Sequence, residues 1–203
     1  MPSVVVPFRG ESAKSRLVPV PEDLREAVAL AMLADVLAAC SKVGDTVLVA
    51  SKASAGELAE ELGVRIVDDP GGGQGEAVVA ALATAERLPL LVVNADLPCV
   101  QPRDLLTLLG ALPDGGIALV EAADGTTNAL ALAAPHLFAP LYGPRSAERF
   151  LARARRLEVR AMPTEIPNLA EDVDTLYDLE RLEGRLGPRT AAALEELRTG
   201  LPQ

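Results

Sequence analysis

The chain has 203 residues, of which 49% are hydrophobic and 24% charged, proportions typical of a folded globular protein rather than a disordered one. Its 29 Asp and Glu residues outnumber 19 Lys and Arg residues, and the net charge of -10 argues against a protein that binds nucleic acid or anionic membranes. No apolar run reaches the about 18 residues of a membrane span, and the N-terminus lacks the pattern of a signal peptide, so we expect a single cytoplasmic domain over residues 1–203.

Strand and helix patterns alternate along the chain. In chain order we expect a strand at 3–8, a helix at 21–41, a strand at 45–50, a helix at 55–62, a strand at 64–67, a helix at 76–88, a strand at 89–94, a helix at 102–112, strands at 116–122 and 129–133, a helix at 146–156, a strand at 157–161, and helices at 175–184 and 188–199. This order predicts an α/β fold, a three-layer sandwich around a mostly parallel, Rossmann-like sheet. In such sheets ligands bind beyond the carboxyl ends of the strands.

A basic loop follows the first expected strand. It carries Arg9, Lys14 and Arg16, which together could wrap a triphosphate. The loop is not a Walker A motif, because the Gly-Lys-Ser/Thr ending is missing. An exposed basic loop without a ligand is the alternative.

A glycine-rich turn precedes the helix expected at 76–88. Its residues include Gly73, Gln74 and Gly75, and glycine lets a backbone approach a ligand closely at a helix N-terminus, where anions or polar ring edges are favoured. The alternative is a flexible surface turn. The absence of Gly-x-Gly-x-x-Gly after the first strand speaks against a dinucleotide-binding dehydrogenase.

Three aspartates follow expected strands. Asp96 comes directly after the most apolar strand, where a carboxylate is costly to bury without a cation or donors. Asp172 and Asp174, two residues apart, would point to the same side of an extended segment. Oxygen ligands of this kind favour a hard cation such as Mg²⁺. A turn former at Asp96 and a helix cap at Asp174 are the alternatives.

Two polar turns complete the candidate residues. One contains Thr127 and Asn128, and the other contains Gly143 and Ser146. Each could bind a small anion through backbone N–H groups and hydroxyls, but each taken alone favours a hairpin turn or a helix cap.

Taken together, these segments resemble the 2-phospholactate guanylyltransferase family of coenzyme F420 biosynthesis. The resemblance runs from Val4 to Leu179 through, in order, Val6–Arg9 with Ala13–Leu17, Leu30–Leu37, Asp96–Pro98 with Asp104–Leu105, Gly125–Leu130, Tyr142–Ser146 and Asp172–Thr175. The pattern departs at Gly73–Ala77, which stands where many members have Gly-Leu-Asn-x-Ala. It departs also at Phe8-Arg9, where many have an aliphatic residue and Lys.

The resemblance implies a nucleotide-diphospho-sugar-transferase-like fold and transfer of GMP from GTP to phosphoenolpyruvate or 2-phospholactate, with release of pyrophosphate. It implies Mg²⁺ on Asp96, Asp172 and Asp174, the triphosphate on Lys14, Arg9 and Arg16, and guanine facing Gly73, Gln74 and Gly75. The acceptor would then sit on Thr127, Asn128, Gly143 and Ser146. The alternatives are a nucleotidyltransferase of the same fold with a molybdopterin or sugar-phosphate acceptor, and a nucleotide-binding protein without activity. The oligomeric state is left open, a homodimer included.

Overall fold

The computed structural model describes residues 1–9 and 21–200, so Lys14 and Arg16 lie outside the described residues. Within these ranges the strands are β1 (Ser3–Pro7), β2 (Asp45–Val49), β3 (Arg65–Val67), β4 (Leu90–Val93), β5 (Ile117–Glu121), β6 (Thr127–Leu132) and β7 (Ala161–Pro163). The helices are α2 (Glu22–Ser41), α3 (Lys52–Glu61), α4 (Gln74–Leu82), α5 (Pro102–Gly110), α6 (Ser146–Arg156), α7 (Pro167–Ala170), α8 (Leu176–Leu182) and α9 (Pro188–Gly200), with short 3₁₀ turns η1 (Pro135–Leu137) and η2 (Glu183–Arg185).

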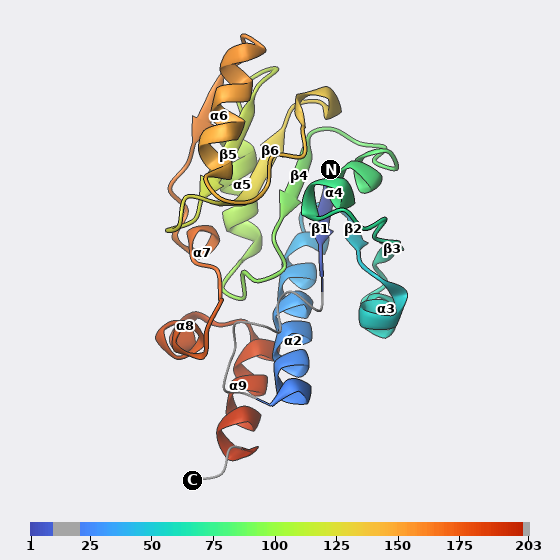
Figure 1. The fold of residues 1–203 in the computed structure, drawn as a ribbon, viewed down its shortest axis with the longest axis vertical. Helices are drawn as coiled ribbons and strands as arrows, with labels where there is room; N and C mark the ends of the chain where they lie inside the picture. Colours follow the sequence, from blue (N-terminus) through green and yellow to red (C-terminus); the bar gives the residue numbers. More distant parts are fainter. Residues whose placement is uncertain (10–20, 201–203) are drawn as a thin grey trace.

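The strands form one sheet in the order β3-β2-β1-β4-β6-β5-β7 (Figure 1). Only β6 runs antiparallel to its neighbours β4 and β5, while the other pairs are parallel. The sheet is therefore mostly parallel, as the sequence predicts. Because β6 is reversed, its first residues lie at the same edge as the carboxyl ends of β4 and β5.

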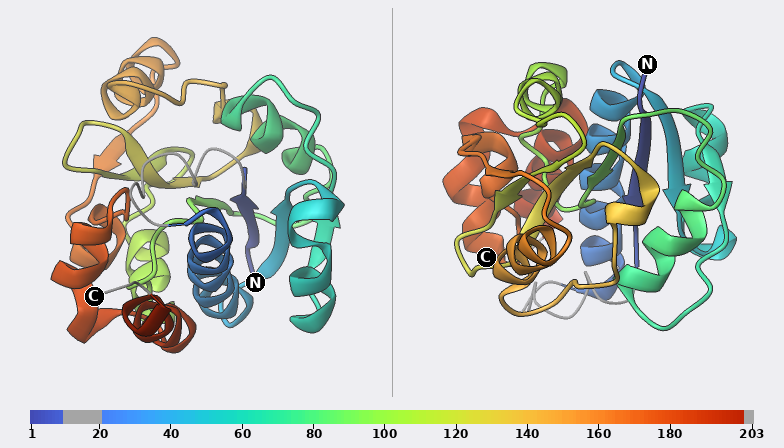
Figure 2. Two further views of the ribbon diagram at one scale, coloured as in Figure 1. Left: turned by 60° about the horizontal axis from the view of Figure 1, so that its bottom comes forward. Right: turned by 90° about the horizontal axis from the view of Figure 1, so that it is seen from above.

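Helices cover both faces of the sheet, which confirms the predicted three-layer sandwich (Figure 2). Val4 and Val6 of β1 pack with residues of α2, α3, α5 and α7 on one face. Val5 packs with residues of α4 and α6 on the other face. All three valines are fully buried, which explains why the middle of β1 is continuously apolar instead of alternating.

The C-terminal helices form a further cluster outside α2. Helix α9 packs alongside α2 (Figure 1), and apolar residues of α2, α8 and α9 share a buried cluster with Cys99. Asp35 of α2 accepts hydrogen bonds from the Thr190 backbone N–H (2.8 Å) and hydroxyl (2.7 Å), so it caps the start of α9. None of the described helices is long and apolar enough to cross a membrane.

Two of the expected elements have different bounds in the structure. The helix expected at 76–88 ends at Leu82, where the N–H and the hydroxyl of Thr84 both donate to the Ala81 carbonyl and close the last turn. The strand expected at 157–161 is wrong in position. Leu157 and Val159 donate back to carbonyls of α6, and Glu158 has a positive φ of 54°, so these residues end that helix and the strand begins at Ala161.

Candidate functional site

The predicted polar residues gather at the carboxyl edge of the central strands. The Asn94 N–H, just after β4, donates to the Asn128 carbonyl near the start of β6 (3.0 Å). The Asn128 side chain then donates from Nδ2 to Asp172 Oδ1 (3.2 Å). The Val173 N–H donates to the Asp96 carbonyl (3.0 Å), which joins the loop after β4 to the loop before α8. Asn128, Asp96 and Asp172 thus come from distant parts of the sequence to one place.

The start of α6 forms a seat rich in hydrogen-bonding groups. The Ser146 hydroxyl donates to the Thr127 hydroxyl (3.1 Å), and both side chains are buried. The Ser146 N–H donates to the Gly143 carbonyl (3.0 Å), and Gly143 has a φ of 107°, a conformation that favours glycine. The structure therefore brings Thr127, Gly143 and Ser146 together at the N-terminus of an 11-residue helix. Hydroxyls beside a helix N-terminus suit a phosphate or carboxylate.

The surroundings of Asp172 disfavour the charged form of its carboxyl group. Burial raises the pKa of its carboxyl, against the hydrogen bond from Asn128, and the charges of Asp174 and Asp124 raise the pKa further. Asp178 holds the neighbouring backbone, since its carboxylate accepts from the Thr175 N–H (2.8 Å) and caps α8. The loop is thus fixed by its cap, and burial disfavours the charged form of Asp172.

The carboxylates of this site meet the requirements of a metal-binding site only in part. In the described portion of the chain, no group of three or more His, Cys, Asp or Glu side chains is arranged to hold an ion. A single ion held by Asp96, Asp172 and Asp174 together thus stays a prediction. Mg²⁺ usually takes one or two carboxylates and completes its shell with water and substrate phosphates. A half-buried carboxylate of raised pKa with further carboxylates near it suits that mode of binding.

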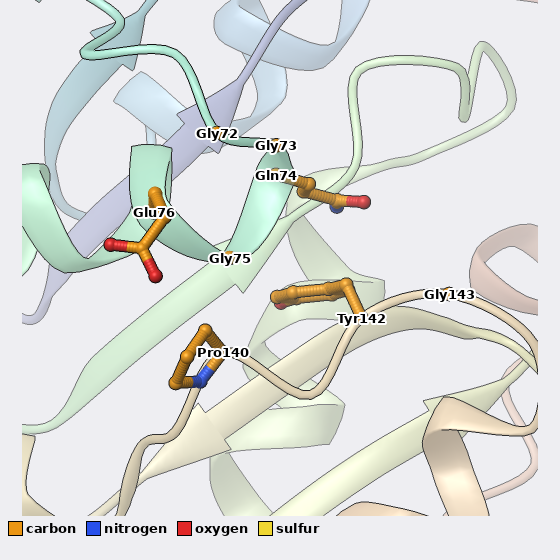
Figure 3. Close-up of a pocket in the computed structure, with 8 residues that line it drawn as sticks. All are labelled: Gly72, Gly73, Gln74, Gly75, Glu76, Pro140, Tyr142 and Gly143. Atoms are coloured by element: carbon orange, nitrogen blue, oxygen red, sulfur yellow. The ribbon is translucent and has the colours of Figure 1, made fainter.

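A cavity of about 370 Å³ opens beside the glycine turn. It is lined by Gly72, Gly73, Gln74, Gly75, Glu76, Pro140, Tyr142 and Gly143, so it lies between the start of α4 and the segment that leads to α6 (Figure 3). Its volume lies in the range of small-molecule sites. The three predicted turn residues Gly73, Gln74 and Gly75 all line it.

Arg9 lies next to this turn. Its Nε is 3.7 Å from Asp69 Oδ2, and its Nη1 lies 3.9 Å from where a Cβ on Gly73 would be. Gly73 has a φ of 108°, so the backbone there takes a form that side chains disfavour. The structure thereby places one of the three predicted triphosphate residues against the predicted base-binding turn. Lys14 and Arg16 lie outside the described residues.

Sequence reasoning missed the far wall of the cavity. Tyr142 packs edge-on against Phe150, with ring centroids 5.5 Å apart, and burial raises the pKa of its hydroxyl, which stays neutral at ordinary pH. Arg149 of α6 donates to the carbonyls of Leu141 (2.7 Å) and Tyr142 (2.9 Å). The many arginines of the helix at 146–156 suggest a helix that is exposed to solvent. The four-residue spacing of Arg149 and Arg153 is the signal that could have shown that one face of this helix turns inward.

We expect Gly75→Ala to raise the KM for the nucleotide by about tenfold, which corresponds to about 1.4 kcal/mol of binding free energy. An added Cβ at Gly75 would lie 2.5 Å from Pro140 Cβ, so α4 or the facing segment must move and the cavity must change shape. Steady-state kinetics at varied nucleotide would measure this. Gly110→Ala, where an added Cβ meets no atom within 4 Å, is the control, and an equal KM in both variants would contradict the placement of the nucleotide.

Comparisons with known proteins show the family to which the chain is similar. A family model described as "Guanylyl transferase CofC like" matches residues 2–185. A phosphoenolpyruvate guanylyltransferase of Nocardia farcinica is 35% identical over 93% of this chain and 88% of its own length. One of Streptomyces scabiei is 36% identical over 96% of each chain.

Solved structures share the fold at low sequence identity. A Desulfovibrio desulfuricans protein, provisionally assigned as a nucleotide-diphospho-sugar transferase, superposes with a TM-score of 0.76 at 18% identity and 98% coverage of both chains. A 2-C-methyl-D-erythritol 4-phosphate cytidylyltransferase of Thermus thermophilus superposes with a TM-score of 0.60 at 16% identity, over 89% of this chain and 96% of its own. The predicted nucleotide-diphospho-sugar-transferase-like fold is confirmed.

Proposed function

Because this chain belongs to the CofC-like guanylyl transferase family, we propose that it transfers GMP from GTP to phosphoenolpyruvate and releases pyrophosphate, a reaction of coenzyme F420 biosynthesis. The observation that carries the choice of acceptor is that relatives named phosphoenolpyruvate guanylyltransferase match nearly the whole chain at 35% and 36% identity. The cytoplasm, where such small phosphorylated substrates occur, is the compartment that this proposal implies.

The acceptor would bind at the start of α6. Phosphoenolpyruvate carries a phosphate and a carboxylate. The N-terminus of α6 offers backbone donors to such groups, and the Ser146 hydroxyl, which donates to Thr127 Oγ1, would leave the Thr127 hydroxyl proton to point toward the acceptor. Asn128 is 1% exposed and already donates to Asp172, so it would hold that carboxylate beside the acceptor. Seating the acceptor rigidly in this way lowers the entropic part of the barrier.

The nucleotide would bind across the glycine turn. Guanine would enter the cavity between Gly75 and Tyr142, and Arg9 would lie beside the phosphates with Lys14 and Arg16 from the same loop. The base would thus lie on the α4 side and the acceptor on the α6 side of the segment from Pro140 to Gly143. The α-phosphorus of GTP would then lie between the guanine base and the acceptor phosphate.

The transfer itself needs alignment and charge neutralisation. An oxygen of the acceptor phosphate attacks the α-phosphorus of GTP, a P–O bond forms, and the bond to pyrophosphate breaks. Phosphate monoesters are nucleophilic at neutral pH, so the chain needs no strong base. A divalent cation bound by Asp172 with Asp96 or Asp174 would neutralise phosphate charge during the reaction. The arginine and lysine side chains of the first loop would do the same for the leaving group.

The decisive experiment is pyrophosphate release from GTP with phosphoenolpyruvate, 2-phospholactate and 3-phosphoglycerate, followed by mass spectrometry of the product. A guanylylated phosphoenolpyruvate would support the proposal. A product only with 2-phospholactate would change the acceptor but keep the reaction. No product with any acceptor would overturn the proposed activity.

We expect GTP to be preferred over ATP, CTP and UTP. A site that pairs with one base edge rejects another base by leaving buried polar groups unpaired, at a cost of about 1–3 kcal/mol for each lost hydrogen bond. In this chain the backbone of the glycine turn, Gln74 and Glu76 line the cavity and can supply such groups. Competition between nucleotides at equal concentration measures the preference, and equal turnover with ATP would contradict it.

A further inference from the structure

A chain of side-chain amides runs from the cavity to Asp172. Gln74 Nε2 donates to Asn94 Oδ1 (2.7 Å), and Asn94 Nδ2 donates to Asn128 Oδ1 (3.4 Å) and to the Thr127 carbonyl (3.3 Å). Asn128 Nδ2 in turn donates to Asp172 Oδ1 (3.2 Å). The chain crosses from the start of α4, over the ends of β4 and β6, to the loop before α8.

The Thr127 carbonyl sets the direction of these hydrogen bonds. A backbone carbonyl only accepts, so Asn94 must turn its NH₂ group toward Thr127 and toward Asn128 Oδ1. The oxygen of Asn94 is then left to accept from Gln74, and the NH₂ group of Asn128 is left to donate to Asp172. The Gln74 side chain lies above the Tyr142 ring at the cavity (Figure 3).

Asn94 is the central member of this chain. It is half-buried, follows the most apolar strand, and contacts residues of both proposed substrate sites. We propose that Asn94 is a positioning residue, which fixes Gln74 at the nucleotide cavity through its oxygen and Asn128 at the acceptor seat through its nitrogen. This inference rests on the proposed function. A purely structural role, in which Asn94 only ties β4 to β6, is the competing explanation.

Two substitutions at Asn94 separate its oxygen from its nitrogen. Asn94→Asp has nearly the same shape and can still accept from Gln74, but it cannot donate to Asn128 or to the Thr127 carbonyl. Asn94→Leu removes both contacts. Gln74→Leu removes only the contact toward the cavity. The matched control is Thr46→Val, which removes a buried hydrogen bond from Thr46 Oγ1 to the Gly44 carbonyl (3.2 Å), at the opposite edge of the sheet.

The measurements are the KM for GTP and the KM for the acceptor in each variant, with urea unfolding as the test of the fold. We expect Asn94→Asp to raise the acceptor KM by about tenfold and to leave the GTP KM within about twofold. We expect Asn94→Leu to raise both KM values and Gln74→Leu to raise only that for GTP. Thr46→Val should change neither, because it acts on stability alone.

The inference is overturned if Asn94→Asp raises both KM values equally, or if both Asn94 variants behave like Thr46→Val. Should Asn94→Leu fail to fold, Asn94→Asp and Gln74→Leu still supply the contrast between the two sites.

Wild-type turnover with the acceptor panel decides the proposed function separately. Calorimetric binding of GTP with Mg²⁺ requires no turnover. In a protein inactive with every acceptor, weaker binding to Gln74→Leu and Asn94→Leu, with Asn94→Asp unchanged, would support the nucleotide half, and equal binding to all variants would overturn it.

Discussion

Asp172→Asn is expected to abolish GMP transfer while the fold remains intact. The carboxylate lies where the loops of Asp96 and Asn128 meet, so its charge is the part of the site best placed to hold a cation against two polyanionic substrates. Asparagine keeps the shape and can still accept from Asn128 Nδ2. We expect a loss of at least about 100-fold in kcat, the size seen when one group that stabilises developing charge is removed. Pyrophosphate release measures it.

The direction in which Asp172→Asn changes the stability of the protein follows from the pKa of Asp172. The folded pKa of Asp172 is raised, so its ionised form destabilises the protein above that pKa, and this penalty disappears as the pH falls below the unfolded value of about 4. Asp172→Asn should therefore be at least as stable as wild type near neutral pH, and the difference should shrink in acid. Urea unfolding across this range checks it, with the exposed Asp114→Asn as control.

The dependence of activity on a metal ion tests the role of Asp172 in a second way. Activity should vanish with EDTA and return with Mg²⁺. Added Mg²⁺ should also raise the melting temperature of wild type, since a ligand that binds the folded state stabilises it, and this shift should be lost in Asp172→Asn. Full activity in EDTA, or an active Asp172→Asn protein, would contradict the role of the aspartates without contradicting the family.

The second large effect is expected for Lys14→Ala. Loss of a desolvated, charge-assisted contact to the triphosphate costs about 1.5–3 kcal/mol, so kcat/KM for GTP should fall on the order of 10- to 100-fold. The acceptor KM should change little. Lys14 lies in the basic segment that follows β1 in the sequence, and Arg9 at the start of that segment lies beside Gly73. Kinetics with each substrate varied in turn separate the two effects.

The control for Lys14→Ala is Lys42→Ala. Lys42 is exposed in the turn before β2, at the edge of the sheet away from the proposed site, and carries the same charge. Its removal should leave both KM values unchanged. If Lys14→Ala changed only the acceptor KM, the loop would belong to the acceptor and not to the nucleotide.

Much of the fold follows from local patterns in the sequence. The apolar runs at β1 and β4 are buried on both faces, so they show their place at the centre of the sheet directly. The direction of β6 does not follow from such patterns. Apolar residues such as Ala129 and Leu130 give the same sequence pattern whether their strand runs parallel or antiparallel to its neighbours. The end of α4 at Leu82 comes with a tightened last turn, in which the N–H and the hydroxyl of Thr84 both donate to the Ala81 carbonyl, and periodicity does not contain that information.

The candidate site was predictable as a set of residues but not as a set of contacts. Chain order and the rule for parallel sheets were enough to collect Asp96, Thr127 and Asp172 at one edge. The contacts of Asn94 were not predictable, because its partners are distant in the sequence. The spacing of the arginines in α6 can indicate an inward face, but not the groups that this face meets. Arg149 is bound to carbonyls, and a carbonyl leaves no mark in the amino-acid sequence.

The close approach of Gly75 to Pro140 makes these two positions sterically interdependent. Any family member that carries asparagine at the equivalent of Gly75 must have displaced or replaced the residue that faces it. Mutating one position alone, in nature or in a library, would therefore pass through a poorly packed intermediate. A programme to change the base preference of this protein should vary residues 75 and 140 as a pair, and deep mutational scanning would be expected to show strong epistasis between them.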